Sequence, residues 1–139
     1  MTTILKGNIV SAQACGRLDV TEHGYLIAEN GVITGVYPVL PEQYAGAAVE
    51  DYGDDLIVQS FADLHLHGAQ YPMLGMGMDR PLLDWLIAYA FPTEARFADT
   101  DYARTVYRQL AHELAARGTT RVCMFASLHT DATLILMDE

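Results

Sequence analysis

Short runs of alternating apolar and polar residues fill the first part of the chain. Alternation sends successive side chains to opposite faces of a strand, so these runs predict half-buried β-strands. The predicted strands are residues 4–13, 17–21, 25–29 and 32–37. Asn30-Gly31 separates the last two, and this pair predicts a tight hairpin turn because both residues tolerate positive φ. Residues 1–58 are therefore predicted to be a β-rich segment.

The rest of the chain follows a rhythm of strand, loop, helix, helix and strand. A short apolar helix is predicted over residues 82–89, ended by Phe91-Pro92, because proline interrupts a helix interior. A longer helix is predicted from a cap at Asp99 or Thr100 to Gly118, with apolar residues at helical spacing along it. A second strand over 121–128 and a further helix from 133 to 137 are predicted to follow.

This order predicts an α/β unit over residues 59–139, because two strands joined by a helical crossover form the parallel-sheet unit. Functional residues of such units lie at the carboxyl ends of the strands in (β/α) barrels. The polar groups that follow the two predicted strands are thus the first candidates for chemistry.

Composition narrows the class of protein. Of the 139 residues, 51% are hydrophobic and 19% are charged, and no apolar run approaches the ~18 residues of a membrane span, so no membrane partner is expected. Acidic residues outnumber Lys plus Arg by 18 to 8, and Lys6 is the single lysine, so nucleic acid is not expected as a partner. The first residues lack the layout of a secretory signal, and Cys15 and Cys123 form no metal-like pair, which favours the cytoplasm.

The candidate chemistry lies at Asp63-Leu64-His65-Leu66-His67-Gly68-Ala69-Gln70. Alternation places His65 and His67 on one face at the end of a strand, where two imidazoles can hold a metal ion. The spacing alone fits equally well two histidines that merely form hydrogen bonds. Asp63 shares their face, either as an acceptor that fixes an imidazole tautomer or as a structural strand-end acceptor.

Several blocks of the sequence resemble a known family. The strand with paired histidines resembles the first barrel strand of the metal-dependent amidohydrolase superfamily. Five ordered blocks resemble the guanine deaminase family within it: 67–71, 79–86, 91–97, 118–120 and 126–131. The chain departs from the family pattern at Gln59-Ser60, where Pro-Gly is common, and at Gly68, where alanine or a larger residue is frequent.

The resemblance implies an architecture and a reaction. Residues 1–58 would be the N-terminal segment of a small β-sandwich, and residues 59–139 the first strand-helix-strand elements of an incomplete (β/α)8 TIM barrel. The reaction of the family is hydrolysis of guanine to xanthine and ammonia with one Zn²⁺ per intact site, and the intact family is expected to be homodimeric. The roles implied are zinc binding for His65 and His67 and substrate binding for Gln70. Trp85 and Leu83 are predicted to be substrate-binding residues of the pocket wall, or core residues, because a helix this apolar must pack against another surface.

No catalytic proton carrier is assigned within these residues, because the family takes its glutamate, its aspartate and two further histidines from later barrel strands. The chain is therefore expected to be a truncated N-terminal portion, inactive alone, with unpaired strand edges. Two alternatives stay open. One is part of another amidohydrolase acting on a different purine, pyrimidine or triazine ring, and the other is a non-catalytic interaction domain.

Overall fold

The computed structural model describes residues 1–139, apart from the side chain of Gln13. The chain forms two compact units, Met1–Gln59 and Ser60–Glu139. Among the residues that the structure describes, no helix combines the length and the apolar character that crossing a membrane requires.

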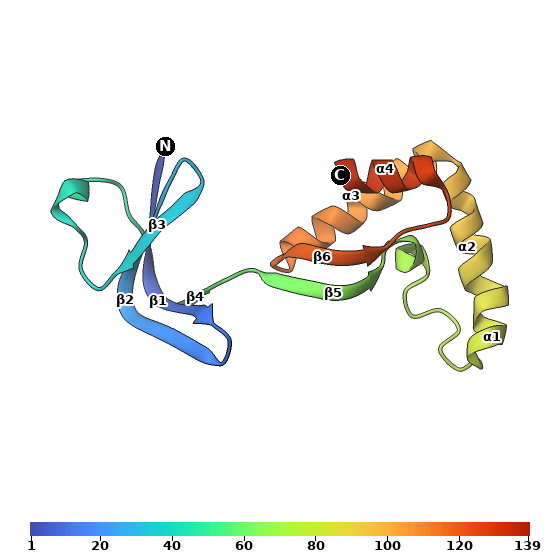
Figure 1. Cartoon of the computed structure of the whole chain (residues 1–139), viewed down its shortest axis with the longest axis horizontal. Coiled ribbons are helices and arrows are strands. Elements are labelled where there is room, and N and C mark those ends of the chain that lie inside the picture. The colour runs from blue at the N-terminus through green and yellow to red at the C-terminus, as the bar shows by residue number, and fades with distance from the viewer. The chain divides into compact units, whose positions relative to one another are not determined.

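The first unit is built on a four-stranded sheet (Figure 1). Its strands are β1 (Thr2–Ala14), β2 (Arg17–Glu29), β3 (Val32–Tyr37) and β4 (Glu50–Val58), arranged in the order β3-β2-β1-β4. β2 pairs antiparallel with both β1 and β3, whereas β4 pairs parallel with β1. The alternating pattern buries Ile4, Ile9 and Ile27, which form the small apolar centre of this unit.

The predicted hairpin is confirmed. Asn30 and Gly31 have φ of 53° and 81°, the positive values that a two-residue turn of this type needs. The prediction of separate strands at 17–21 and 25–29 is wrong, because β2 runs unbroken through both. The chain absorbs the irregularity between them at His23, whose φ is 48°, with a register shift against β1, so pairing resumes on either side.

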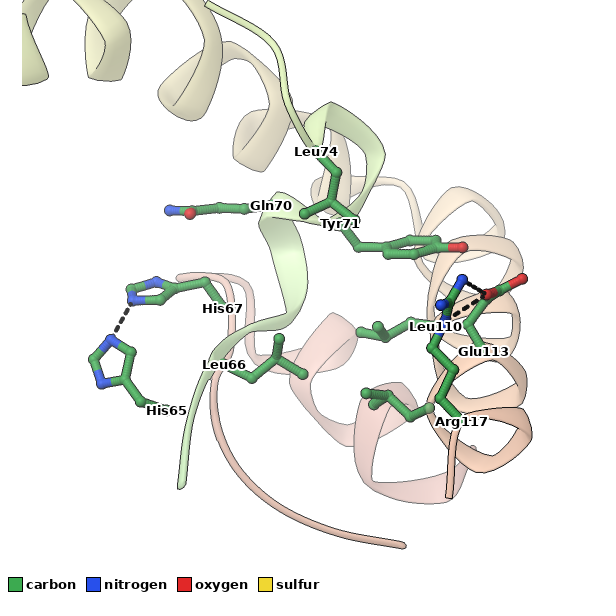
Figure 2. Close-up of a pocket in the computed structure, with 10 residues that line it drawn as sticks. His65, Leu66, His67, Gln70, Tyr71, Leu74, Leu110, Glu113 and Arg117 are labelled. Atoms are coloured by element: carbon green, nitrogen blue, oxygen red, sulfur yellow. Dashed lines mark hydrogen bonds and ion pairs between the residues drawn. The ribbon is translucent and has the colours of Figure 1, made fainter. Parts of the chain in front are cut away.

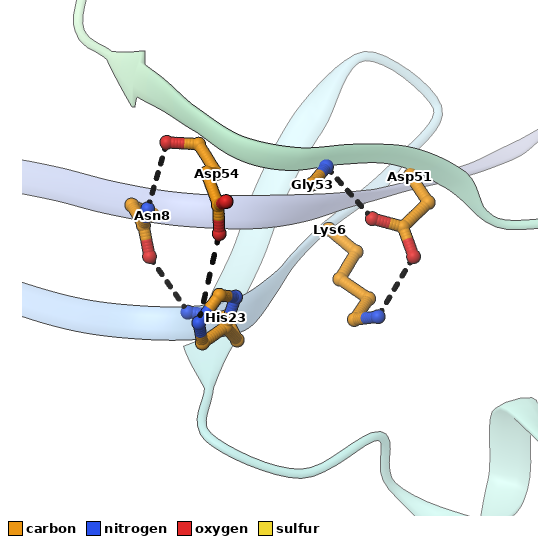
Figure 3. Close-up of polar contacts among 6 residues, drawn as sticks. All are labelled: Lys6, Asn8, His23, Asp51, Gly53 and Asp54. Carbon is orange, nitrogen blue, oxygen red and sulfur yellow. Dashed lines mark hydrogen bonds and ion pairs between the residues drawn. The ribbon is translucent and has the colours of Figure 1, made fainter.

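The side chain of Asn8, on β1, forms hydrogen bonds with irregular positions of both neighbouring strands (Figure 3). Its Oδ1 accepts a hydrogen bond from the backbone N–H of His23 at 3.0 Å, and its Nδ2 donates to the backbone carbonyl of Asp54 at 2.9 Å. Nearby, the Lys6 ammonium donates to the Asp51 carboxylate at 2.7 Å, and this contact lowers the pKa of Asp51. One amide side chain thus satisfies a backbone group on each neighbour of β1.

Asn8→Ala is expected to lower the free energy of unfolding by about 1 kcal/mol, because two backbone groups lose their partner but can reach water. Amide hydrogen exchange at His23 and urea unfolding followed by far-UV circular dichroism measure the effect. Asn8→Asp keeps the acceptor for His23, removes the donor to Asp54 and adds a negative charge beside Asp54, so it should leave the exchange at His23 slow. Unchanged exchange at His23 in Asn8→Ala would contradict this role.

The second unit packs helices against one side of a parallel strand pair (Figure 1). The strands are β5 (Phe61–His67) and β6 (Thr119–Phe125), and the long helices are α3 (Thr100–Ala116) and α4 (Thr130–Asp138). Phe97 and Tyr107 are fully buried at the centre of the apolar core between these elements. Leu66 of β5 packs against this core, which leaves the opposite face of β5 for its polar residues.

Both ends of α3 follow the sequence-based prediction. The Asp99 side chain accepts hydrogen bonds from the backbone N–H groups of Asp101 and Tyr102, as a helix cap does. Gly118 follows the helix with φ of 79°, and its N–H donates to the carbonyl of Ala115 at 3.0 Å.

The prediction that Phe91-Pro92 ends the preceding helix is wrong. Helical backbone continues from α1 (Leu82–Trp85) through a wide turn at Leu86–Ala90 into α2 (Phe91–Ala95). The wide turn has i→i+5 hydrogen bonding, and Pro92 falls in the first turn of α2, where an amide N–H is dispensable. Pro92 therefore lies in the first turn of α2 and does not interrupt the helical backbone.

The strand pair keeps open edges and apolar surface, as the sequence predicts. No other strand of the described residues pairs with β5 or β6. Phe61, Leu64, Val122 and Phe125 of this pair remain exposed. Exposed apolar residues on an open strand pair are typical of an interaction surface.

Candidate functional site

The candidate site begins at the carboxyl end of β5. Alternation along the strand brings His65 and His67 to the same face, as predicted, and Figure 2 shows their rings turned toward one another. The two Nε2 atoms lie 3.3 Å apart. Both side chains are exposed, so an ion or a substrate can reach them.

This separation suits a shared metal ion. Zinc–imidazole bonds of about 2.0–2.1 Å that meet at the tetrahedral angle place two nitrogens about 3.3–3.4 Å apart. A direct hydrogen bond between the two rings fits the same separation, because one ring nitrogen can donate while the other accepts. The donor set and its spacing therefore fit zinc, with His65 and His67 as two of its ligands.

The described residues do not complete a metal centre. Among them, no group of three or more His, Cys, Asp or Glu side chains converges on one point. The Asp63 carboxylate is bonded to the backbone and not to an imidazole: its Oδ1 accepts a hydrogen bond from the backbone N–H of His65 at 3.0 Å. Of the two roles considered for Asp63, the structural strand-end acceptor is the one that the structure contains.

Gln70 lies next to the histidines on the turn Gly68–Met73 that follows β5. In Figure 2 its amide extends to the same side as the two imidazoles. Its Nε2 donates to Oε1 of Glu94, on α2, at 3.4 Å, and both side chains are partly buried. A carboxylate only accepts hydrogen bonds, so this contact directs the nitrogen end of the amide toward Glu94.

The turn that carries Gln70 packs closely against the core. A Cβ built on Gly68 would lie 2.6 Å from Sδ of Met124 and 3.5 Å from Cε1 of Tyr107. Burial raises the pKa of the Tyr107 hydroxyl above its ordinary value. The glycine lets β5 turn directly over these two side chains and so fixes where Gln70 begins.

A hollow of about 380 Å³ runs along the free edge of β5. His65, His67 and Gln70 border one side of it and side chains of α3 the other, and in Figure 2 the imidazoles and the Gln70 amide point away from those α3 side chains. The lining is completed by Leu66, Tyr71, Leu74, Leu110, Glu113, Leu114 and Arg117. Glu113 and Arg117 form the ion pair expected from their spacing of one helical turn, at 3.2 Å.

The structure does not bring Trp85 and Leu83 to this hollow. Trp85 lies on α1, where its indole N–H donates to the backbone carbonyl of Met76 at 2.8 Å. Leu83, on the same helix, is 65% exposed. Their assignment as substrate-binding residues stays a prediction.

Sequence reasoning missed Glu94 and Phe125. Glu94 lies in the block 91–97 that carries the family resemblance, but no local pattern links it to Gln70. Phe125 could have been found, because the carboxyl ends of adjacent parallel strands lie at the same edge of a sheet. In the structure Phe125 pairs with His67 across that edge.

Comparison with known proteins relates this arrangement to one group of enzymes. No family model matches the chain. A guanine deaminase of Pongo abelii is 42% identical over 84 residues, which are 60% of this chain and 18% of that protein. A probable guanine deaminase of Deinococcus radiodurans is 38% identical over 124 residues, which are 89% of this chain and 27% of that protein.

A solved structure extends the match to the fold. A crystal structure of guanine deaminase from C. acetobutylicum, with guanine bound in its active site, superposes with a TM-score of 0.89 at 38% identity. The match covers 99% of this chain and 33% of that one. This chain thus spans a third or less of the proteins that it matches.

Proposed function

We propose that this chain, whose sequence and fold match the N-terminal portion of guanine deaminases, contributes the first half of a zinc site that hydrolyses guanine to xanthine and ammonia. The observation that carries the proposal is the pair of Nε2 atoms 3.3 Å apart at the end of β5, with Gln70 beside them. The guanine bound to the C. acetobutylicum enzyme supports the choice of substrate.

His65 and His67 hold the metal in this proposal. Their position at the carboxyl end of a parallel strand is where (β/α) barrels place their functional residues. Zinc, when bound, activates water for attack at neutral pH and polarises the group under attack. The two imidazoles supply neutral nitrogen donors and leave further positions for other ligands and for water.

Gln70 binds the substrate. Because one amide N–H is directed to Glu94, the carbonyl oxygen and the second N–H remain available to a ligand. An acceptor beside a donor complements a lactam edge, in which an N–H stands next to a carbonyl oxygen. Glu94 is thereby a positioning residue, because it fixes which end of the Gln70 amide meets each atom of the ring.

The second unit corresponds in this proposal to the opening of a (β/α)8 barrel, and the first unit to part of a β-sandwich. A barrel of this kind takes about 250 residues, and a catalytic zinc takes at least three protein ligands. The described residues bring together two imidazoles. The 139-residue chain by itself is therefore proposed to bind zinc weakly and to release no ammonia from guanine.

A zinc titration of the 139-residue chain tests the metal role directly. Long-range ¹H–¹⁵N correlation spectra should show the Nε2 signals of His65 and His67 shifting together, with a single dissociation constant. His65→Ala should remove the response of His67 as well, because one imidazole alone is a poor zinc ligand. Zinc-dependent shifts at His23, His112 or His129 with none at the β5 pair would refute the proposal.

A further inference from the structure

Three aromatic rings form a closed cluster at the end of the β5–β6 pair. Phe125, the last residue of β6, lies opposite His67 in the strand register. Its ring centroid is 4.8 Å from that of His67, with 14° between the planes, and 5.0 Å from that of His65. The two imidazole centroids are 5.1 Å apart, so each ring contacts the other two.

Packing of the core does not account for this position of Phe125. The side chain is 51% exposed, whereas Phe97 and Tyr107 of the core are fully buried. A half-exposed ring gains only part of the hydrophobic stabilisation that burial provides. Its aromatic contacts are with the two imidazoles, in the offset-stacked and tilted geometries that aromatic pairs favour.

We propose that Phe125 is a positioning residue for the metal ligands, an inference that rests on the zinc role proposed for His65 and His67. The stack restricts rotation of the His67 ring, so that its Nε2 stays directed at the point shared with Nε2 of His65. A ligand already held in its binding rotamer loses less conformational entropy when the metal arrives.

The electrostatics of the Phe125–His67 contact also favours the metal-bound state. An imidazole bound to a divalent cation carries more positive charge than a free one. The face of the Phe125 ring is the electron-rich side of its quadrupole, and it lies nearly parallel to the His67 ring. The contact is therefore stronger in the metal-bound state than in the free state, and this difference contributes to metal affinity.

Zinc titration of the 139-residue chain and its Phe125→Leu variant tests the inference, with affinity read from the Nε2 signals of His65 and His67. Phe125→Leu keeps an apolar side chain and removes the ring, and it is expected to weaken zinc binding about tenfold, as loss of a group that orients metal ligands does. Phe125→Tyr restores the ring and is expected to bind zinc like the wild type. Phe61→Leu is the matched control, because Phe61 lies at the far end of β5 and is also exposed.

The outcomes separate this inference from the proposed function. If the wild-type histidines do not respond to zinc, the proposed function fails. If they respond and Phe125→Leu binds zinc equally well, or if Phe61→Leu weakens binding as much as Phe125→Leu, the inference is overturned. Should Phe125→Leu unfold, the wild-type chain decides: nuclear Overhauser contacts between Phe125 and His67 must persist at zinc saturation, and their loss overturns the inference.

Discussion

His67→Ala is expected to lower guanine deamination by about a thousandfold if the proposed function holds, because it removes one proposed ligand of a metal that would supply several kcal/mol of transition-state stabilisation. The test uses a chimera in which residues 1–139 are joined to the part of the C. acetobutylicum guanine deaminase that follows its matched region. This chain superposes on that enzyme with a TM-score of 0.89 over 99% of its length, so the junction is placed at the end of the matched region. Ammonia release and zinc content per molecule are the measurements, and both should fall together.

His112→Ala is the matched control for this loss. His112 is an exposed histidine on α3 and does not line the hollow at β5. Its substitution should leave activity and zinc content unchanged, and the 139-residue chain without the added part should release no ammonia. Full activity of the His67→Ala chimera, with zinc still bound, would remove His67 from the metal site.

Gln70→Ala is expected to lower kcat/KM for guanine by about 10–100-fold in the same chimera, since it removes hydrogen bonds worth about 1.5–3 kcal/mol. Zinc content should not change, because Gln70 is not a proposed ligand. Steady-state kinetics with guanine, together with metal analysis, separates the two effects. This combination distinguishes a residue that binds the ring from one that holds the metal.

Two further variants make the Gln70 result specific. Gln109→Ala makes the same change at an exposed position of α3 and should leave kcat/KM unchanged. Glu94→Gln keeps the shape of the side chain but lets the Gln70 amide turn over, so it should lower kcat/KM by less than Gln70→Ala does. Wild-type kinetics in Gln70→Ala would show that another residue binds the purine.

Turns, helix caps and strand faces were predictable from the sequence, because each depends on residues that are neighbours along the chain. The Asn30-Gly31 turn follows from the backbone freedom of two residues, and the Asp99 cap from a side chain beside its own helix. The shared face of His65 and His67 follows from strand alternation. Each of these depends on residues within a few positions of one another.

Predictions were wrong where a neighbouring element changes the local outcome. Pro92 was expected to stop a helix, but the wide turn before it places the proline where no amide donor is needed. The gap predicted at His23 was closed by pairing with β1 and by the contact with Asn8. In both cases hydrogen bonds from elsewhere offset a local preference.

The sequence by itself determined the order of elements, the pairing of two histidines at a strand end and the resemblance that suggests guanine as the substrate. Only the tertiary structure decided the 3.3 Å between their Nε2 atoms, the Glu94 contact of Gln70 and the stacking of Phe125 on His67. The physical reason is the separation along the chain over which each interaction acts. Alternation and capping act within one element, whereas Glu94 and Phe125 reach the site only because α2 packs beside the turn after β5 and β6 pairs with β5.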